Sequence, residues 1–194
     1  MTSPSACIRR VTAEEVHQAW LLQAQGASST GGVTQCAVRV GQLFGSENND
    51  DTLPEEEYEL RQREAPDLFW GYFENGRLIG FASASLTSES KVTARARLAH
   101  DPDGSTVCLN TLRVHPDYHG KGIETVLIDH LLWYVEENLK NVNQVSLVCR
   151  DTLIQFYEGL HFRCLGPSMV SLGVSSKQWF DMEYKMSHEN TGFA

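Results

Sequence analysis

The sequence predicts an α+β domain in which one mixed sheet carries helices on its faces. Two strand-like runs are joined by Asn75-Gly76, a strand, a glycine-containing turn and a helix follow one another over residues 107–134, and two more strand candidates close the chain. The predicted order is strand, helices, three strands, long helix, strand, helix and two strands. At 194 residues, we expect a single domain over residues 1–194.

The N-terminal part contains one strand and several helix candidates. Residues 8–11 predict a short strand, and Thr12-Ala13-Glu14-Glu15 after them has the form of a capping box. The helix that this box starts is expected to end near Gly26. Residues 36–44 and 55–63 predict two further helices.

The next segment predicts a β-hairpin. Residues 68–74 and 77–86 are rich in aromatic and aliphatic side chains, and Asn75-Gly76 lies between them. This dipeptide tolerates the positive φ angles of a type I′ turn, which is the turn that suits a two-residue hairpin. We expect the polar stretch through residues 100–105 to lead from this hairpin into the strand at 107–114.

The C-terminal half is expected to alternate between helices and strands. Its predicted long helix places four side chains on one face, namely Ile123, Leu127, Leu131 and Tyr134. Val145, Leu147 and Cys149 alternate as in a half-buried strand. Asp151 is expected to cap a short helix that ends near residue 159. The last two strands are expected around residues 163–171 and 178–186.

Composition excludes several classes of protein. A net charge of −9 disfavours a general nucleic-acid binder and suits a cationic partner such as an amine. The five cysteines are widely spaced and form no C-x-x-C pair, which indicates a reduced, cytoplasmic protein without a metal site. We expect no membrane segment, because no window approaches the roughly 18 apolar residues of a span.

The turn His-Gly-Lys-Gly at residues 119–122 is suited to an anion. Gly120 and Gly122 allow backbone amides to face a ligand, and the helix N-terminus behind them adds about half a positive charge. Together these features predict a phosphate site. The spacing matches neither a P-loop nor G-x-G-x-x-G, and the turn taken alone is equally typical of a flexible connection.

Two motifs in this region resemble one known family. The run VHPDYHGKGI at 114–123 resembles the acetyl-CoA-binding segment of the GNAT N-acetyltransferases, and FYEGLHF at 156–162 resembles a second element of that family. The segments LFWGYFENGRLIGF, CLNTLRVHPDY and LGPSMVSLG are similar to the serotonin (arylalkylamine) N-acetyltransferase branch and its fungal polyamine-acetylating relatives. The resemblance runs from about residue 50 to the C-terminus. It implies a GNAT fold, with a mixed, mostly antiparallel sheet of about seven strands, and acetyl-CoA as co-substrate.

The resemblance also implies a cofactor site. The strand backbone would bind the pantetheine arm, and the turn with the first residues of the helix would hold the pyrophosphate. The implied residues are Leu112, Arg113, Val114, His119, Gly120, Lys121, Gly122, Ile123, Glu124 and Thr125. His119 stands where the family prefers Arg or Gln, and Glu124 replaces a final Gly or Ala. We therefore expect CoA to bind, but less tightly than with glycine at position 124.

The catalytic residues implied by the resemblance are incomplete. Tyr157 matches a tyrosine that donates a proton to the departing CoA thiolate. Cys108 and Asn110 stand where the vertebrate branch carries two histidines, and neither is an ordinary general base. Asp51, three residues before a proline followed by acidic residues, resembles an acidic residue of the invertebrate and fungal relatives and is our first candidate for the base. Two histidines, His100 and His115, are weaker candidates.

The function expected from this resemblance is acetyl transfer from acetyl-CoA to a small primary amine by direct attack in a ternary complex. The amine would be an arylalkylamine or a polyamine. Several aromatic residues are available for an arylalkyl pocket, namely Phe69, Trp70, Tyr72, Phe73 and Trp179. Two alternatives stay open: a catalytically degenerate module that binds an acyl-CoA or a protein partner, and a protein or peptide N-acetyltransferase. We expect a monomer or a dimer.

Overall fold

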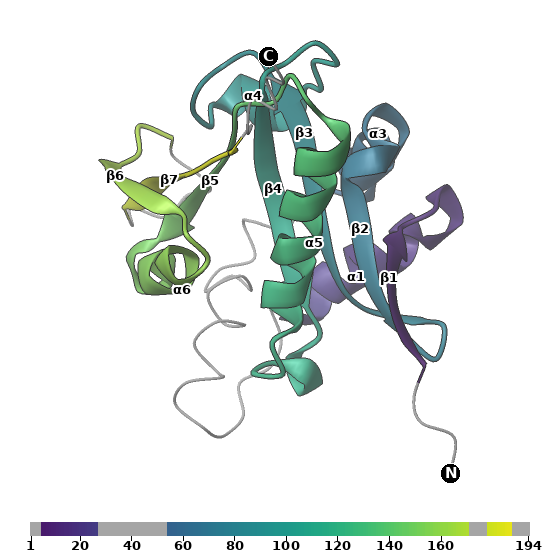
Figure 1. Cartoon of the computed structure of the whole chain (residues 1–194). Helices are drawn as coiled ribbons and strands as arrows, with labels where there is room; N and C mark the ends of the chain where they lie inside the picture. The colour runs from purple at the N-terminus through teal and green to yellow at the C-terminus, as the bar shows by residue number, and fades with distance from the viewer. Residues whose placement is uncertain (1–4, 27–53, 171–177, 188–194) are drawn as a thin grey trace, which may run out of the picture.

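A seven-stranded mixed sheet forms the centre of the molecule, in the order β1-β2-β3-β4-β5-β7-β6 (Figure 1). The computed structural model describes residues 5–26, 54–170 and 178–187. The predicted helix at 36–44 and the candidate base Asp51 lie outside these residues. Within them, the predicted α+β class and the mostly antiparallel sheet are confirmed.

Four antiparallel strands make up the first part of the sheet. They are β1 (Ala6–Arg10), β2 (Phe69–Glu74), β3 (Arg77–Thr87) and β4 (Thr106–Val114). Asn75 and Gly76 have φ values of 51° and 79°, as a type I′ turn requires. The predicted hairpin is therefore confirmed. Its second strand, β3, pairs with β4.

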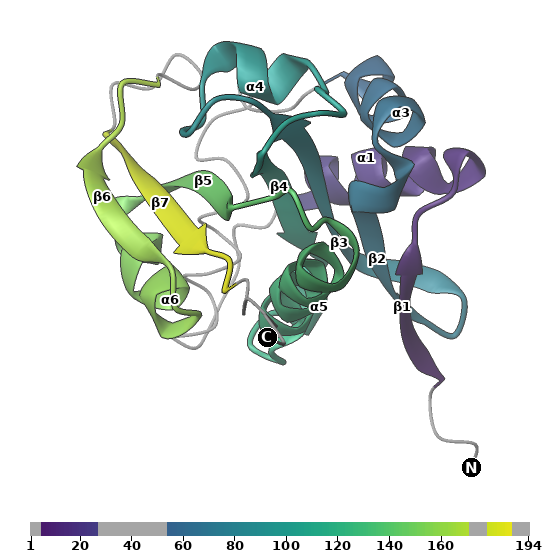
Figure 2. The same cartoon turned by 45° about the horizontal axis from the view of Figure 1, so that its top comes forward.

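Helices cover both faces of this part of the sheet (Figure 2). The first to follow β1 are η1 (Ala13–Glu15) and α1 (Val16–Gly26), and α3 (Glu55–Glu64) and η3 (Pro66–Leu68) precede β2. The predicted capping box is present, since the Glu15 carboxylate accepts a hydrogen bond from the Thr12 N–H at 3.1 Å. α1 and α3 pack on the face opposite to the one that carries α5.

A short helix, α4 (Ala94–Leu98), interrupts the connection between β3 and β4. The sequence interpretation made no prediction for residues 87–99, where this helix lies. Thr93 caps this helix, with its hydroxyl oxygen accepting from the Ala96 N–H at 3.0 Å. A threonine followed by the helix formers Ala-Arg-Ala-Arg-Leu was the available signal.

The long helix α5 (Ile123–Asn138) follows β4 after a turn that contains η4 (Pro116–Tyr118). The four side chains predicted to share a face are all buried, with exposed fractions from 0% to 7%. Among the described residues, no helix is both long and apolar enough to cross a membrane.

The second part of the sheet contains β5 (Gln144–Arg150), β6 (Arg163–Pro167) and β7 (Trp179–Lys185), with β7 between the other two. Between β5 and β6 lie η5 (Asp151–Leu153) and α6 (Ile154–Gly159). Asp151 does not cap α6. Its carboxylate accepts from the neighbouring Thr152 N–H at 2.9 Å, inside a 3-10 turn that precedes α6.

The two parts of the sheet are joined by a short parallel pairing. β4 and β5 share only the pairs Thr106–Gln144, Val107–Val145 and Cys108–Ser146. Beyond these, β5 continues to pair with β7 while β4 continues to pair with β3, and the two strands diverge (Figure 1). Among the described residues, the edge of β4 that faces β5 therefore lacks a strand partner from Leu109 onward.

Candidate active site

The turn after β4 has the geometry of an anion site. Gly120 and Gly122 have φ values of 75° and 77°, a region in which side chains other than glycine are strained. Gly122 is the N-cap of α5 and offers no side-chain cap, and the first helical bond joins the Val126 N–H to the Gly122 carbonyl at 3.1 Å. The amides of the first turn therefore have no intrahelical acceptor and point out of the helix end.

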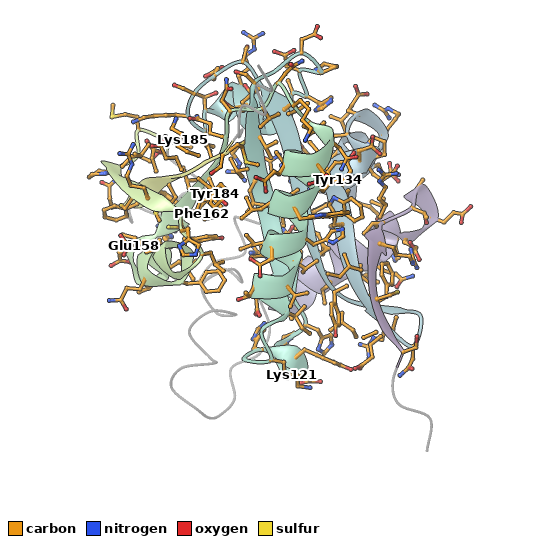
Figure 3. All side chains as sticks on the ribbon, viewed as in Figure 1. Lys121, Tyr134, Glu158, Phe162, Tyr184 and Lys185 are labelled. Carbon is orange, nitrogen blue, oxygen red and sulfur yellow. The ribbon has the colours of Figure 1, made fainter. Side chains whose placement is uncertain are left out.

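Two side chains of the turn already have partners. His119 Nε2 lies 2.8 Å from the Val114 carbonyl, so that nitrogen carries the hydrogen and ties the turn to the end of β4. The ammonium group of Lys121 lies 4.2 Å from the centre of the Tyr118 ring, at the lower end of α5 in Figure 3. The lysine is thus held against an aromatic ring rather than over the helix end.

The open edge of β4 is the segment predicted for the pantetheine arm. Two of its carbonyls accept hydrogen bonds from side chains, Leu112 from Arg113 Nη1 at 3.2 Å and Val114 from His119. A ligand that pairs with this edge must therefore share or replace these contacts.

Glu124 lies inward in the first turn of α5. Only 4% of the residue is exposed, and one carboxylate oxygen is buried without a hydrogen-bond partner among the described residues. Burial raises the pKa of this carboxyl above its usual range, while its own backbone amide and the charge of His119 act in the opposite direction. Of the implied cofactor residues, it is the one whose charge opposes a bound pyrophosphate.

A β-bulge interrupts β4 at Asn110. Ser83 pairs with Thr111 and Ala84 pairs with Leu109, so Asn110 has no partner in β3. The bulge directly follows the last residues that pair with β5, at the point where the two strands diverge. Bulges often re-aim side chains next to active sites. No signal in the sequence indicated it.

The side chains around the bulge form a short hydrogen-bonded chain. Asn110 Nδ2 donates to Ser85 Oγ at 2.9 Å, and Ser85 Oγ donates to the Ala96 carbonyl of α4 at 2.9 Å. Asn110 Oδ1 lies 3.3 Å from the Cys108 thiol, which donates to it. The unpredicted helix α4 therefore fixes the two residues that stand at the family histidine positions.

Cys108 is a poor proton acceptor in this environment. Its thiol is fully buried beside Val92 and Ala96. Burial raises the pKa of this thiol to about 12, so it stays protonated at neutral pH.

Tyr157, the predicted proton donor, lies on α6. It is 2% exposed and packs against the rings of Phe156 and Phe162, the latter at a centroid distance of 5.6 Å (Figure 3 labels Phe162). Burial raises the pKa of its phenol well above the usual value, and the positive charge of Arg113 on β4 partly offsets this rise. The phenol is therefore protonated at neutral pH, as a proton donor must be.

The two weaker base candidates are engaged elsewhere. His100 Nδ1 accepts from the Leu86 N–H at 3.1 Å, and burial lowers the pKa of this histidine. The ring of His115 lies against Tyr118, its Nδ1 accepts from the Asp117 N–H at 3.3 Å, and burial lowers its pKa as well.

The sequence interpretation also missed a buried arginine, which lies on the face of the sheet that contains the bulge. Arg61 of α3 is 7% exposed and donates to Thr111 Oγ1 of β4 at 3.0 Å. Its position in a charged segment, EEEYELRQRE, gave no sign of burial. Arg61, Ser85 and His100 border a small cavity behind the bulge.

Known proteins resemble this chain in sequence. The family model "Acetyltransferase (GNAT) family" matches residues 38–162. A protein named serotonin N-acetyltransferase from Mesocricetus auratus is 34% identical over 108 residues, which are 56% of this chain and 52% of that protein. The chain spans about half the length of the curated relatives it matches.

Solved structures share the fold at low sequence identity. The loading GNATL domain of CurA from Lyngbya majuscula superposes with a TM-score of 0.76 at 14% identity, covering 95% of this chain and 99% of that one. Arabidopsis thaliana Naa50, solved with the bisubstrate analogue CoA-Ac-MVNAL, gives a TM-score of 0.62 at 15% identity and coverages of 93% and 98%. With the family model matching more than half of its length, the chain belongs to the acetyltransferase (GNAT) family.

Proposed function

We propose that this chain transfers the acetyl group of acetyl-CoA to a small primary amine by direct attack in a ternary complex. The observation that carries the proposal is the unit formed by β4, the glycine turn and the start of α5. Within the described residues, it combines a strand edge that lacks a strand partner with a helix N-terminus that lacks a side-chain cap. These features suit an extended arm that ends in phosphates, because the strand edge offers backbone hydrogen bonds and the helix N-terminus favours an anion. The name of the serotonin N-acetyltransferase relatives supports an amine acceptor.

The residues implied for acetyl-CoA fit the cofactor in part. The amides of Ile123, Glu124 and Thr125 suit the pyrophosphate, and the open edge of β4 suits the arm. The inward carboxylate of Glu124 opposes the same ligand. When bound, acetyl-CoA would supply the thioester that the amine attacks. We assign the pyrophosphate to the turn, with Glu124 as the residue that weakens its binding.

Tyr157 is the proposed proton donor to the CoA thiolate. Its phenol is protonated at neutral pH and lies in an apolar environment, as the role requires. The base is proposed to be Asp51. Cys108, with its thiol pKa raised to about 12, and Asn110, which does not titrate, support a base outside β4.

The acceptor is proposed to be an arylalkylamine or a polyamine. Three of the aromatic residues predicted for an arylalkyl pocket pack in the core: Phe69 and Phe73 below α1 and α3, and Trp70 against α5. Trp179 on β7 stays half-buried, with the Arg150 guanidinium 4.0 Å from its ring centre. Tyr72 on β2 is also half-buried, so an aryl group would depend on Tyr72 and Trp179 more than on the three core aromatics.

The test is a thiol-release assay with acetyl-CoA and a panel of tryptamine, serotonin, phenethylamine, spermidine and putrescine. The proposal expects turnover with at least one of these amines. A peptide with a free N-terminus belongs in the same panel, because Naa50 shares the fold and was solved with a peptide-bearing analogue. Turnover with the peptide alone would favour a protein N-acetyltransferase.

A second candidate is a GNAT module that binds CoA without turnover. The buried carboxylate of Glu124 and the absence of a titratable group at Asn110 favour it. Calorimetric binding of CoA together with no turnover across the whole panel would establish this alternative.

A further inference from the structure

Glu124 is the feature of the cofactor turn that the proposed function leaves unused. It lies on the buried arc of α5 with Leu127, Ile128 and Leu131, which follow it at helical spacings of three, four and seven residues. Those three positions carry aliphatic side chains that pack in the main core. A glutamate in such an arc, in the first helical turn, therefore places a carboxyl group at the inner side of the anion site.

The carboxyl group has only weak support for its charged form, because its own backbone amide lowers its pKa less than burial raises it. One of its oxygens is buried and accepts no hydrogen bond within the described chain. His119, whose charge also acts on this carboxyl, donates its Nε2 hydrogen to the Val114 carbonyl. Buried carboxylates without a partner favour the protonated form, because desolvation penalises the charge.

A phosphate group at the first turn would add a second negative charge at the same place. The two charges repel most strongly where water is excluded, so the anion and an ionised Glu124 disfavour each other. We propose that Glu124 acts as a proton-linked affinity residue of the cofactor site, so that CoA binds with uptake of one proton by this carboxyl group. This inference rests on the proposed assignment of the pyrophosphate to the turn.

The sign of the pH dependence follows from linkage. Bound pyrophosphate raises the pKa of Glu124 further above its value in the free protein, where burial has already raised it. At pH values between the free and the bound pKa, binding takes up a proton and affinity falls by up to about tenfold per pH unit. Below the free pKa the carboxyl is neutral in both states, and above the bound pKa it is charged in both, so this contribution no longer changes.

The test is isothermal titration of CoA into wild type and Glu124→Gln from pH 5.5 to 8.5. Two buffers without phosphate and with different ionisation enthalpies report the protons taken up. The CoA phosphates, whose second pKa is about 6, also titrate in this range, but they are common to both proteins. We expect wild type to take up close to one proton more than Glu124→Gln within the window, and to lose affinity more steeply as pH rises.

Two further variants complete the design. Glu124→Gly removes the carboxyl altogether and should bind CoA at least about tenfold more tightly than wild type at pH 8, where repulsion is greatest. Glu137→Gln on the exposed face of the same helix makes the same change in net charge and should behave like wild type. Thermal unfolding of each variant controls for folding.

The outcomes separate the inference from the proposed function. Identical proton uptake and pH dependence in wild type and Glu124→Gln would overturn the inference, while CoA binding by both would leave the proposed function intact. Binding only by Glu124→Gln and Glu124→Gly would support the inference in its strongest form. Absence of CoA binding in all folded variants would overturn both.

Discussion

The two faces of the central strands are built from different chemistry. On the face that carries α5, β3 and β4 present Ala82, Ala84, Leu86, Val107, Leu109 and Leu112, all of which belong to the main core. On the opposite face, the same strands present Ser83, Ser85, Thr87, Thr106, Cys108 and Thr111, which are equally buried. A strand that is buried on both faces normally reads as continuously apolar. Here one of the two buried faces is polar, and it is the face that contains the bulge.

The difference teaches where stability and function reside. The apolar face is stabilised by area removed from water, at about 25 cal/mol per Å². The polar face gains less, because a buried hydroxyl at best exchanges a bond to water for one to a protein group. We infer that the buried polar side chains serve mainly to fix the positions of residues in β4, chiefly Asn110 and Thr111.

Truncation on the apolar face should have the largest effect. Leu131→Ala removes a side chain that is 1% exposed between α5 and the sheet. We expect a loss of about 2–5 kcal/mol in the free energy of unfolding, measured by urea denaturation. Trp133→Ala on the same helix, at a residue that is 55% exposed, should change it far less. Equal losses would show that α5 does not pack as described.

The pH dependence of turnover should identify the general base. Asp51→Asn should lower turnover by about a hundredfold near pH 7 and by less at alkaline pH, where the free amine is already present. Cys108→Ala is the matched control on the polar face. Because burial raises the pKa of this thiol to about 12, its removal should leave the shape of the pH–rate profile unchanged. An unchanged profile in Asp51→Asn would remove that residue from the mechanism.

The Tyr157→Phe variant tests whether the buried phenol on α6 contributes to the chemistry. Tyr157→Phe keeps the ring among Phe156 and Phe162 and removes only the hydroxyl. We expect turnover to fall by about tenfold to a hundredfold with CoA affinity nearly unchanged, as measured by steady-state kinetics and calorimetry. Wild-type turnover would reduce Tyr157 to a packing residue.

The smallest effects should come from single hydroxyls on the polar face. Ser83 Oγ is buried without a hydrogen-bond partner, so Ser83→Ala should be neutral or stabilise the fold by up to about 1 kcal/mol. Ser85→Ala is the matched change at a hydroxyl that bonds both Asn110 and the Ala96 carbonyl, and it should cost about 1–3 kcal/mol. Urea denaturation distinguishes the two. Equal costs would contradict the described hydrogen bonds.

Much of the architecture was predictable because its signals are local. Asn75-Gly76 specifies its own turn through backbone sterics, and the spacing of Ile123, Leu127 and Leu131 specifies the buried face of α5. The glycine turn was equally predictable, since glycine adopts the positive φ angles of residues 120 and 122 without contacts from distant parts of the chain. In each case the free energy that selects the conformation comes from residues close together in the chain.

The tertiary structure decided what depends on register and burial. The bulge at Asn110 arises from the pairing of β4 with β3, and the burial of Arg61 arises from the packing of α3 on Thr111. The direction of Glu124 is the clearest case. The sequence put a carboxylate where the family has glycine or alanine, but only the packing of α5 turned it inward and left its oxygen without a partner. Desolvation is a property of the folded environment, so no local pattern could have supplied it.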